Sequence, residues 1–153
     1  MKILFVCLGN ICRSPIAEGV MKNICVQNNV SWTIESAGTN NYHTGEPPHK
    51  YSQMVCHQHG IDISSQRAKR FMVEDIEKYD IIYALATDVY QEISFIAKEK
   101  MDVKKVKLFL DELYLNENKS VIDPWYGTKE GYYPVFEQIK MCCEKIFEKY
   151  KNH

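Results

Sequence analysis

The chain has 153 residues, of which 45% are hydrophobic and 25% charged, enough apolar material for one globular core. Its 19 basic and 20 acidic residues give a formal net charge of −1, so it lacks the broad basic field that nucleic acids or anionic membranes attract. No apolar run approaches membrane-spanning length, and the first one, residues 3–6, is too short for a signal-peptide core. We therefore expect a single domain over residues 1–153, cytoplasmic, with no nucleic-acid or membrane partner.

The first part of the chain alternates between strand-like and helix-like patterns. Residues 3–6 are a continuous apolar run typical of a buried strand, and between 16 and 25 apolar residues recur every three or four positions, as on one face of a helix. Residues 32–37 are predicted to form a second strand before a turn, and 51–59 a helix that stops at Gly60.

The same alternation continues towards the C-terminus. Residues 80–86 form a nearly continuous apolar run of the kind found in strands covered on both faces, and 106–110 a fourth such run. Helical spacing predicts a helix over 89–97 and another over 135–150. Joined by right-handed crossovers, these elements predict an α/β fold of three layers: a small four-stranded parallel twisted sheet with helices on both faces.

The segment VCLGNICRSPIAEG leads from the first strand through a loop into the first helix. Backbone amides, the helix dipole and the guanidinium of Arg13 can converge there on one anion of phosphate size. Gly9 and Asn10 suit such a loop because both tolerate a left-handed backbone. The same positive field favours the thiolate of Cys7. Ser14 can donate a hydrogen bond to that sulfur or cap the helix. The alternative is a core cysteine and a surface arginine flanking an ordinary loop.

This loop resembles the one in the low-molecular-weight protein tyrosine phosphatases, which reads Cys, five residues, Arg and Ser or Thr. That family also carries a general-acid aspartate in an Asp-Pro-aromatic-Tyr segment near the C-terminus, and DPWYG, beginning at Asp123, matches it. The resemblance covers nearly the whole chain, including the segments SAGT, GEPP and HGIDISS. It implies a metal-independent phosphatase on a small parallel sheet, with the phosphate-binding loop after the first strand.

The resemblance also implies a role for each matched residue. Cys7 is then the nucleophile, Arg13 the clamp on the phosphate, and Asp123 the general acid that protonates the leaving oxygen. Ser14 donates to the sulfur of the nucleophile. Cys12 matches the second loop cysteine of the family, which can trap an oxidised Cys7 as a disulfide, and the enzyme would accordingly be redox-sensitive.

The remaining implied roles concern support and substrate contact. Asn10, held by Ser36, would shape the loop with a left-handed backbone. The phosphate-binding loop would comprise Leu8, Gly9, Asn10, Ile11, Cys12 and Arg13. The slot above it would be lined by Leu8, Ile11, Tyr42, Trp125 and Tyr126. Implied partners are phosphotyrosine proteins or small aryl phosphates, with inorganic phosphate as product and competitive ligand. No cofactor or metal is implied, and we expect a monomer or weak self-association.

Two positions depart from the family pattern. Gln66 stands where many members carry a histidine soon after the Ser-Ser pair, and Leu85 and Ala86 stand where a Met-Asp pair is expected. The first departure puts the hydrogen-bond network beneath the loop in question, and the second removes a nearby carboxylate. Neither affects the nucleophile, the clamp or the acid.

Two other cysteine groups have simpler explanations than chemistry. Cys56, His57 and His59 invite a zinc site, but no fourth ligand lies nearby in the sequence, so a structural role is favoured. Cys142 and Cys143 fall on the apolar stripe of the last predicted helix, where cysteines are usually core residues rather than a redox pair.

Three other functions could use the same loop. A protein arginine phosphatase would differ in the slot, where members with that preference tend to carry threonine in place of Ile11; an apolar wall favours a phenyl ring instead. A thiol-dependent arsenate reductase would need further cysteines near the site, and none lies between Cys56 and Cys142. A non-catalytic phosphate-binding module would be expected to lose Cys7 or Asp123. The sequence therefore predicts hydrolysis of phosphotyrosine through a cysteinyl-phosphate intermediate.

Overall fold

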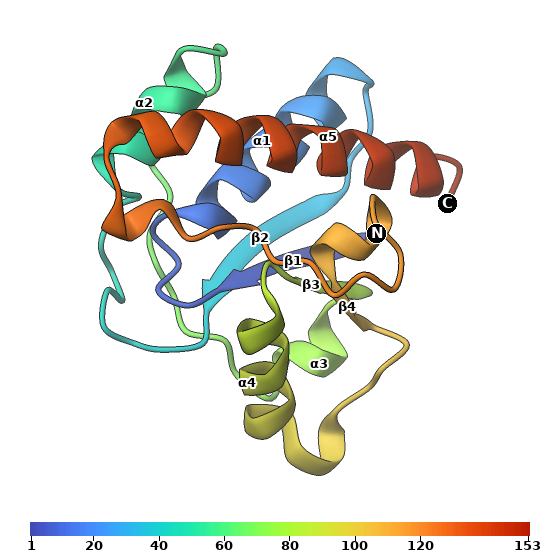
Figure 1. Ribbon diagram of the computed structural model, residues 1–153. Coiled ribbons are helices and arrows are strands. Elements are labelled where there is room, and N and C mark those ends of the chain that lie inside the picture. The colour runs from blue at the N-terminus through green and yellow to red at the C-terminus, as the bar shows by residue number, and fades with distance from the viewer.

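Four short parallel strands form one sheet in the order β2-β1-β3-β4. The computed structural model describes all residues from 1 to 153 (Figure 1). The strands are β1 (Lys2–Cys7), β2 (Thr33–Gly38), β3 (Ile81–Ala84) and β4 (Val106–Leu108). In the register of β1 with β2, Cys7 lies opposite Gly38, so both strands end at the same edge of the sheet. Ligands bind at this edge in open parallel sheets.

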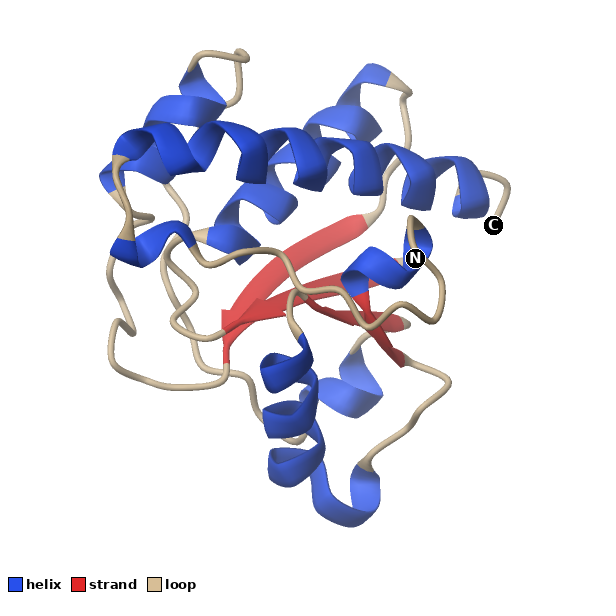
Figure 2. Cartoon of the chain, viewed as in Figure 1, coloured by secondary structure: helices blue, strands red, loops and turns tan.

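Helices cover both faces of the sheet, as Figures 1 and 2 show. One face carries the first, second and last α-helices, and the opposite face carries the other two. These helices are α1 (Arg13–Gln27), α2 (Lys50–His57), α3 (Asp75–Lys78), α4 (Thr87–Ala97) and α5 (Tyr132–Tyr150). The predicted three-layer α/β fold is thus confirmed. No helix in the chain combines the length and the apolar character needed to cross a bilayer.

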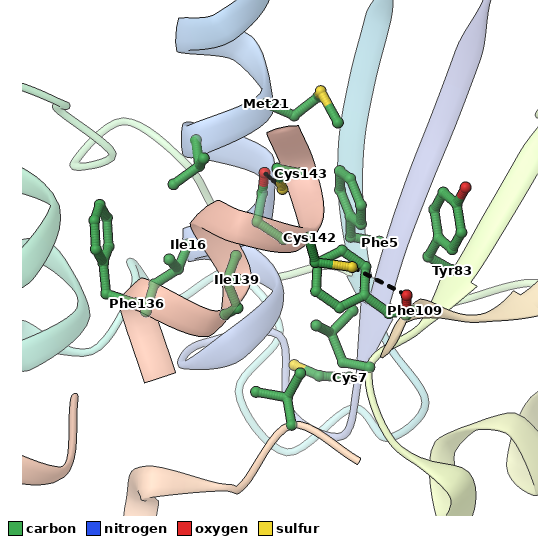
Figure 3. Packing of buried hydrophobic residues seen from close by; sticks show 14 of the residues in the cluster. Phe5, Cys7, Ile16, Met21, Tyr83, Phe109, Phe136, Ile139, Cys142 and Cys143 are labelled. Carbon is green, nitrogen blue, oxygen red and sulfur yellow. Dashed lines mark hydrogen bonds between the residues drawn. The ribbon is translucent and has the colours of Figure 1, made fainter. Parts of the chain in front are cut away.

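Alternating side chains of β1 divide the core into two clusters. Ile3, Phe5 and Cys7 face α1 and α5, whereas Leu4 and Val6 face α3 and α4. Figure 3 shows Cys7 at the lower end of the larger cluster, near the aromatic rings that fill its centre. The ring centroid of Phe5 lies 5.9 Å from that of Tyr83 and 5.7 Å from that of Phe109. This packing holds β1, the strand that ends at Cys7, in place.

The boundaries of several elements differ from those predicted. The fourth strand ends at Leu108 rather than at residue 110, because the chain continues as a buried 3-10 turn, Phe109–Glu112. The third strand covers Ile81–Ala84 rather than 80–86. Helix α3 was not predicted, since four residues are too few to show a periodic pattern. An apolar run alone does not separate a short strand from a buried turn.

The two cysteine groups outside the loop occupy the positions expected of packing residues. Cys142 and Cys143 are fully buried in the larger core, and the Sγ of Cys142 donates to the backbone carbonyl of Phe109 at 3.1 Å (Figure 3). Cys56 is also fully buried there, whereas the neighbouring His57 is exposed. The side chains of Cys56 and His57 therefore have different surroundings.

Candidate active site

The loop between β1 and α1 turns at Asn10, whose φ of 60° lies in the left-handed region. Gly9 does not share this conformation, so of the two loop residues expected to suit a left-handed backbone only Asn10 adopts it. A Cβ atom on Gly9 would lie only 3.0 Å from Cδ2 of His43. A larger residue at this position would therefore require the His43 ring to shift by a few tenths of an ångström.

The Cys7 thiol lies directly against the start of α1. Cys7 is 2% exposed, and its Sγ lies 3.0 Å from Oγ of Ser14. Ser14 is the second residue of α1, and Cys12 occupies the capping position without a side-chain cap. The alternative role of Ser14 as an N-cap is therefore wrong. Its hydroxyl contacts the sulfur and accepts a hydrogen bond from Nδ2 of Asn10 at 2.8 Å.

Arg13 connects this loop to a segment near the C-terminus. Its side chain is buried, its Nη1 donates to the backbone carbonyl of Val121 at 2.9 Å, and its Nη2 lies 3.7 Å from Oδ2 of Asp123. The other carboxylate oxygen of Asp123 accepts the backbone N–H of Trp125 at 3.1 Å, at the start of a 3-10 turn. A guanidinium is costly to bury alone, so these two partners orient it.

A pocket of about 290 Å³ lies above the loop and brings the predicted catalytic and slot residues together, whereas Asn10, Ser14 and Ser36 do not line it. Ile11 is 6% exposed and forms an inner wall, whereas Tyr42 and Tyr126 are more than 80% exposed and stand at the rim. Asn40 and His43 also line the pocket and were not predicted. Both follow the carboxyl end of β2, which was the available signal for them. The full lining is Cys7, Leu8, Gly9, Ile11, Cys12, Arg13, Asn40, Tyr42, His43, Asp123, Trp125 and Tyr126.

Two histidines pack against the aromatic wall of this pocket. The ring centroid of Trp125 lies 5.6 Å from that of His43 and 5.4 Å from that of His49. His43 is also paired with Glu46 at 3.0 Å. Burial, together with the charge of Lys50, lowers the pKa of His49, so its imidazole is neutral at pH 7. The indole thus packs against two imidazoles from the segment that follows β2.

Cys12 shares the pocket with Cys7 and is 5% exposed. Burial raises the pKa of its thiol to about 12, and the nearby hydroxyl of Tyr132, 3.5 Å from the sulfur, offsets only part of this effect. Cys12 is therefore a thiol at neutral pH, whereas a nucleophilic cysteine must be a thiolate. A disulfide between Cys7 and Cys12 stays a prediction.

Comparison with known proteins identifies the relatives of this chain. A sequence model for low molecular weight phosphotyrosine protein phosphatase matches residues 2–153. The chain belongs to this family. The human low molecular weight phosphotyrosine protein phosphatase is 35% identical over 152 residues, which cover 96% of this chain and 94% of the human one. A further relative, YfkJ from Bacillus subtilis, is also named as a low molecular weight protein-tyrosine-phosphatase. The family and these names identify the chain as a cysteine-dependent protein tyrosine phosphatase.

Solved structures of two relatives show the same fold as this phosphatase. The crystal structure of YfkJ from Bacillus subtilis is 30% identical with a TM-score of 0.90, covering 99% of this chain and 94% of YfkJ. The crystal structure of an arginine phosphatase from Drosophila is 28% identical with a TM-score of 0.89, covering 99% of both chains. A protein named as a tyrosine phosphatase and one named as an arginine phosphatase therefore share the architecture of this phosphatase.

The two departures from the family pattern have defined surroundings in this phosphatase. Gln66 donates from Nε2 to the backbone carbonyl of Pro15 at 3.1 Å, and its Oε1 is buried without a partner. Leu85 acts through its backbone: its N–H donates to Val6 and its carbonyl accepts from Val121, at 2.9 and 2.8 Å. Leu85 thus anchors the residue whose carbonyl binds the guanidinium of the loop.

The network beneath the loop ends on a residue that sequence reasoning missed. Asn10 donates from Nδ2 to Oγ of Ser36 at 2.9 Å, and Ser36 donates to Oε1 of Glu18 at 2.6 Å. Glu18 is 7% exposed although it is charged. The available signal was a carboxylate within the apolar first half of α1, where a buried charge requires partners.

Proposed function

We propose that this phosphatase hydrolyses phosphotyrosine in proteins, or small aryl phosphates, through a cysteinyl-phosphate intermediate and without a metal. The observation that carries the proposal is the meeting of three groups in one pocket: the sulfur of Cys7, the guanidinium of Arg13 and the carboxyl of Asp123. Phosphoryl transfer depends mainly on positioning and on stabilising charge at the phosphate oxygens. Together the three groups supply the positioning, the stabilisation of charge and the nucleophile.

In the first step the Cys7 thiolate attacks the phosphorus of the bound phosphotyrosine. Arg13 and the backbone N–H groups of the loop hold the equatorial oxygens, where negative charge is spread in the transition state. The sulfur–phosphorus bond forms as the bond from phosphorus to the tyrosyl oxygen breaks. The carboxyl group of Asp123 gives its proton to that departing oxygen, so that tyrosine leaves as a neutral phenol.

In the second step Asp123, now ionised, takes a proton from a water molecule that attacks the phosphorus. The sulfur–phosphorus bond breaks and Cys7 leaves as a thiolate. The hydroxyl of Ser14, 3.0 Å from the sulfur, stabilises this leaving group. Inorganic phosphate is released and binds the same loop as a competitive ligand.

The lining of the pocket supports phosphotyrosine as the substrate. Ile11 and Trp125 present apolar and aromatic surface above the loop, which suits a flat phenyl ring. Phosphoarginine is the second candidate, because the Drosophila arginine phosphatase shares the fold over 99% of both chains. Arsenate reduction is weaker, since Cys7 and Cys12 are the only two of the six cysteines that line the pocket.

We further propose that residues 1–153 act as one catalytic domain in the cytoplasm, as a monomer or with weak self-association. All six cysteines are free, which suits a compartment that keeps thiols reduced. The exposed rings of Tyr42 and Tyr126 beside the pocket provide apolar surface for contact with a substrate protein.

The decisive experiment measures release of inorganic phosphate in the presence of a chelator, from a phosphotyrosine peptide and from phosphoarginine and phosphoserine. We expect the wild type to prefer phosphotyrosine and Cys7→Ser to be inactive. Asp123→Asn should be slower by about 10²–10⁴-fold, the usual contribution of general acid–base catalysis. Faster turnover of phosphoarginine would reassign the substrate. A folded wild type that binds phosphate but turns over none of these substrates would instead be a binding module.

A further inference from the structure

A continuous series of buried hydrogen bonds runs from Glu18 to the sulfur of Cys7, and we propose that Glu18 is a positioning residue for this nucleophile. The inference rests on the proposed catalytic role of Cys7. The four donor–acceptor distances from Glu18 to Cys7 are 2.6, 2.9, 2.8 and 3.0 Å, and every residue in the series is at most 7% exposed. In order, the series is Glu18, Ser36, Asn10, Ser14 and Cys7.

The orientation of the Asn10 amide sets the direction of the whole series. Its Oδ1 accepts the backbone N–H of Lys69 at 3.0 Å, which places the oxygen on that side and the NH₂ group on the other. The two N–H groups of Nδ2 then donate to the hydroxyls of Ser36 and Ser14. Each hydroxyl has one hydrogen of its own left. The thiolate of Cys7 in the proposed mechanism can only accept, so the hydrogen of Ser14 is directed to it and the serine is the donor.

Glu18 provides the acceptor for the remaining hydrogen, that of Ser36. A carboxylate can only accept, so Ser36 must donate to it and keep a lone pair towards Asn10. Without Glu18 this buried hydroxyl hydrogen would have no partner, and satisfying it elsewhere would rotate Ser36 away from Asn10. Asn10 holds a left-handed backbone, and its side-chain hydrogen bonds stabilise that conformation. Loosening Asn10 then loosens Ser14 against the sulfur.

The buried charge of Glu18 is itself compensated. Its Oε2 lies 2.6 Å from Nζ of Lys22, one helical turn further along α1, and the lysine side chain is half-exposed. Pairing reduces the cost of keeping a carboxylate in the interior. Gln66 makes no hydrogen bond to this series and instead contacts Pro15, so the network beneath the loop ends on Glu18.

The test compares Glu18→Leu with Glu18→Gln, because the amide oxygen of glutamine can still accept from Ser36. The first readout is the rate of Cys7 alkylation by iodoacetate as a function of pH, which reports the thiolate. For Glu18→Leu we expect the midpoint of this profile to rise by about one pH unit, as expected when a hydrogen bond to the thiolate is weakened. Arg13 and Asp123, the charged groups around Cys7, are unchanged in both variants.

The second readout is turnover of a phosphotyrosine peptide. The Leu variant should lose about tenfold in kcat, the effect of one well-placed hydrogen bond, and the Gln variant should recover most of it. Equal losses in both variants with an unchanged alkylation midpoint would show a merely structural role and overturn the proposal. So would a Leu variant with the wild-type midpoint and kcat.

A second substitution keeps the test decisive if the Leu variant does not fold. Ser36→Ala breaks the series at the next residue and should raise the alkylation midpoint by a similar amount. Adding Glu18→Gln to it should have no further effect on the midpoint, because the two residues act through one path. An unchanged midpoint in Ser36→Ala would contradict the proposal. Because alkylation needs no substrate, it tests Glu18 even if the wild type proves inactive on every phosphoester.

Discussion

Asn10 bears the largest backbone constraint in the phosphate-binding loop. A φ of 60° is unfavourable for a residue with a side chain, and hydrogen bonds to Ser14, Ser36 and Lys69 offset this cost. The sequence allowed Asn10 to be predicted because asparagine tolerates this conformation. It did not allow Gly9 or Glu18 to be understood, because their roles depend on contacts with distant segments of the chain.

Substituting Asn10 separates backbone strain from hydrogen bonding. Glycine adopts the left-handed conformation freely and alanine does not, but both lose the amide. We expect Asn10→Ala to be less stable than Asn10→Gly by about 1–2 kcal/mol in urea unfolding, the cost of placing a Cβ in this region. Both variants should lose phosphatase activity to a similar extent. A fully active Asn10→Gly would show that the hydrogen bonds are dispensable for catalysis.

At the scale of elements, apolar periodicity predicted the parallel sheet and its covering helices, because long buried runs depend little on context. It failed at short elements. The chain leaves β4 at Leu108 although Phe109 and Leu110 continue the apolar run, since these two side chains fill the core from a 3-10 turn. The pocket residues Asn40 and His43 were missed for a related reason, as they lie on the irregular segment after β2.

The attachment of β2 to the segment before β3 depends on the ionisation of Glu35. Its carboxylate accepts hydrogen bonds from Lys69 and from the hydroxyl of Tyr79, and Lys78 lies near it. Burial would raise the pKa of Glu35, but these hydrogen bonds and lysine charges outweigh it and lower the pKa to about 2. Lys69 also donates its backbone N–H to Oδ1 of Asn10, so this attachment supports the phosphate-binding loop as well.

The lowered pKa of Glu35 predicts a loss of stability in acid. Because its folded-state value of about 2 lies below the unfolded value of 4.5, the contribution is fully present above pH 4.5. It is lost as the pH falls towards 2. Urea unfolding between pH 3 and 6 should therefore show a smaller acid-dependent loss of stability in Glu35→Gln than in the wild type. The matched control is Glu99→Gln, which removes an exposed carboxylate; the same flattening in both variants would contradict the assignment to Glu35.

For the whole molecule, the candidate site joins the first loop of the chain to a segment 108 residues further along the sequence. The guanidinium of Arg13 reaches the backbone of Val121 and the side chain of Asp123, and Val121 is attached to the sheet through Leu85. Neither the loop nor the C-terminal segment holds the pocket alone. Anion binding should consequently favour the folded chain as a unit, since the site exists only when both segments are in place.

Inorganic phosphate therefore provides a measure of the assembled site. At a concentration one hundred times its Kd, phosphate should stabilise the wild type by about 2.7 kcal/mol, seen as a rise in Tm. Arg13→Ala should show little of this rise, because it removes both the clamp on the anion and the link to Val121. Chloride at the same ionic strength controls for general salt effects. An equal rise in the Tm of Arg13→Ala would place the bound anion outside this pocket. Loss of the rise would show that phosphate binding depends on Arg13, which connects the loop to the segment containing Val121 and Asp123.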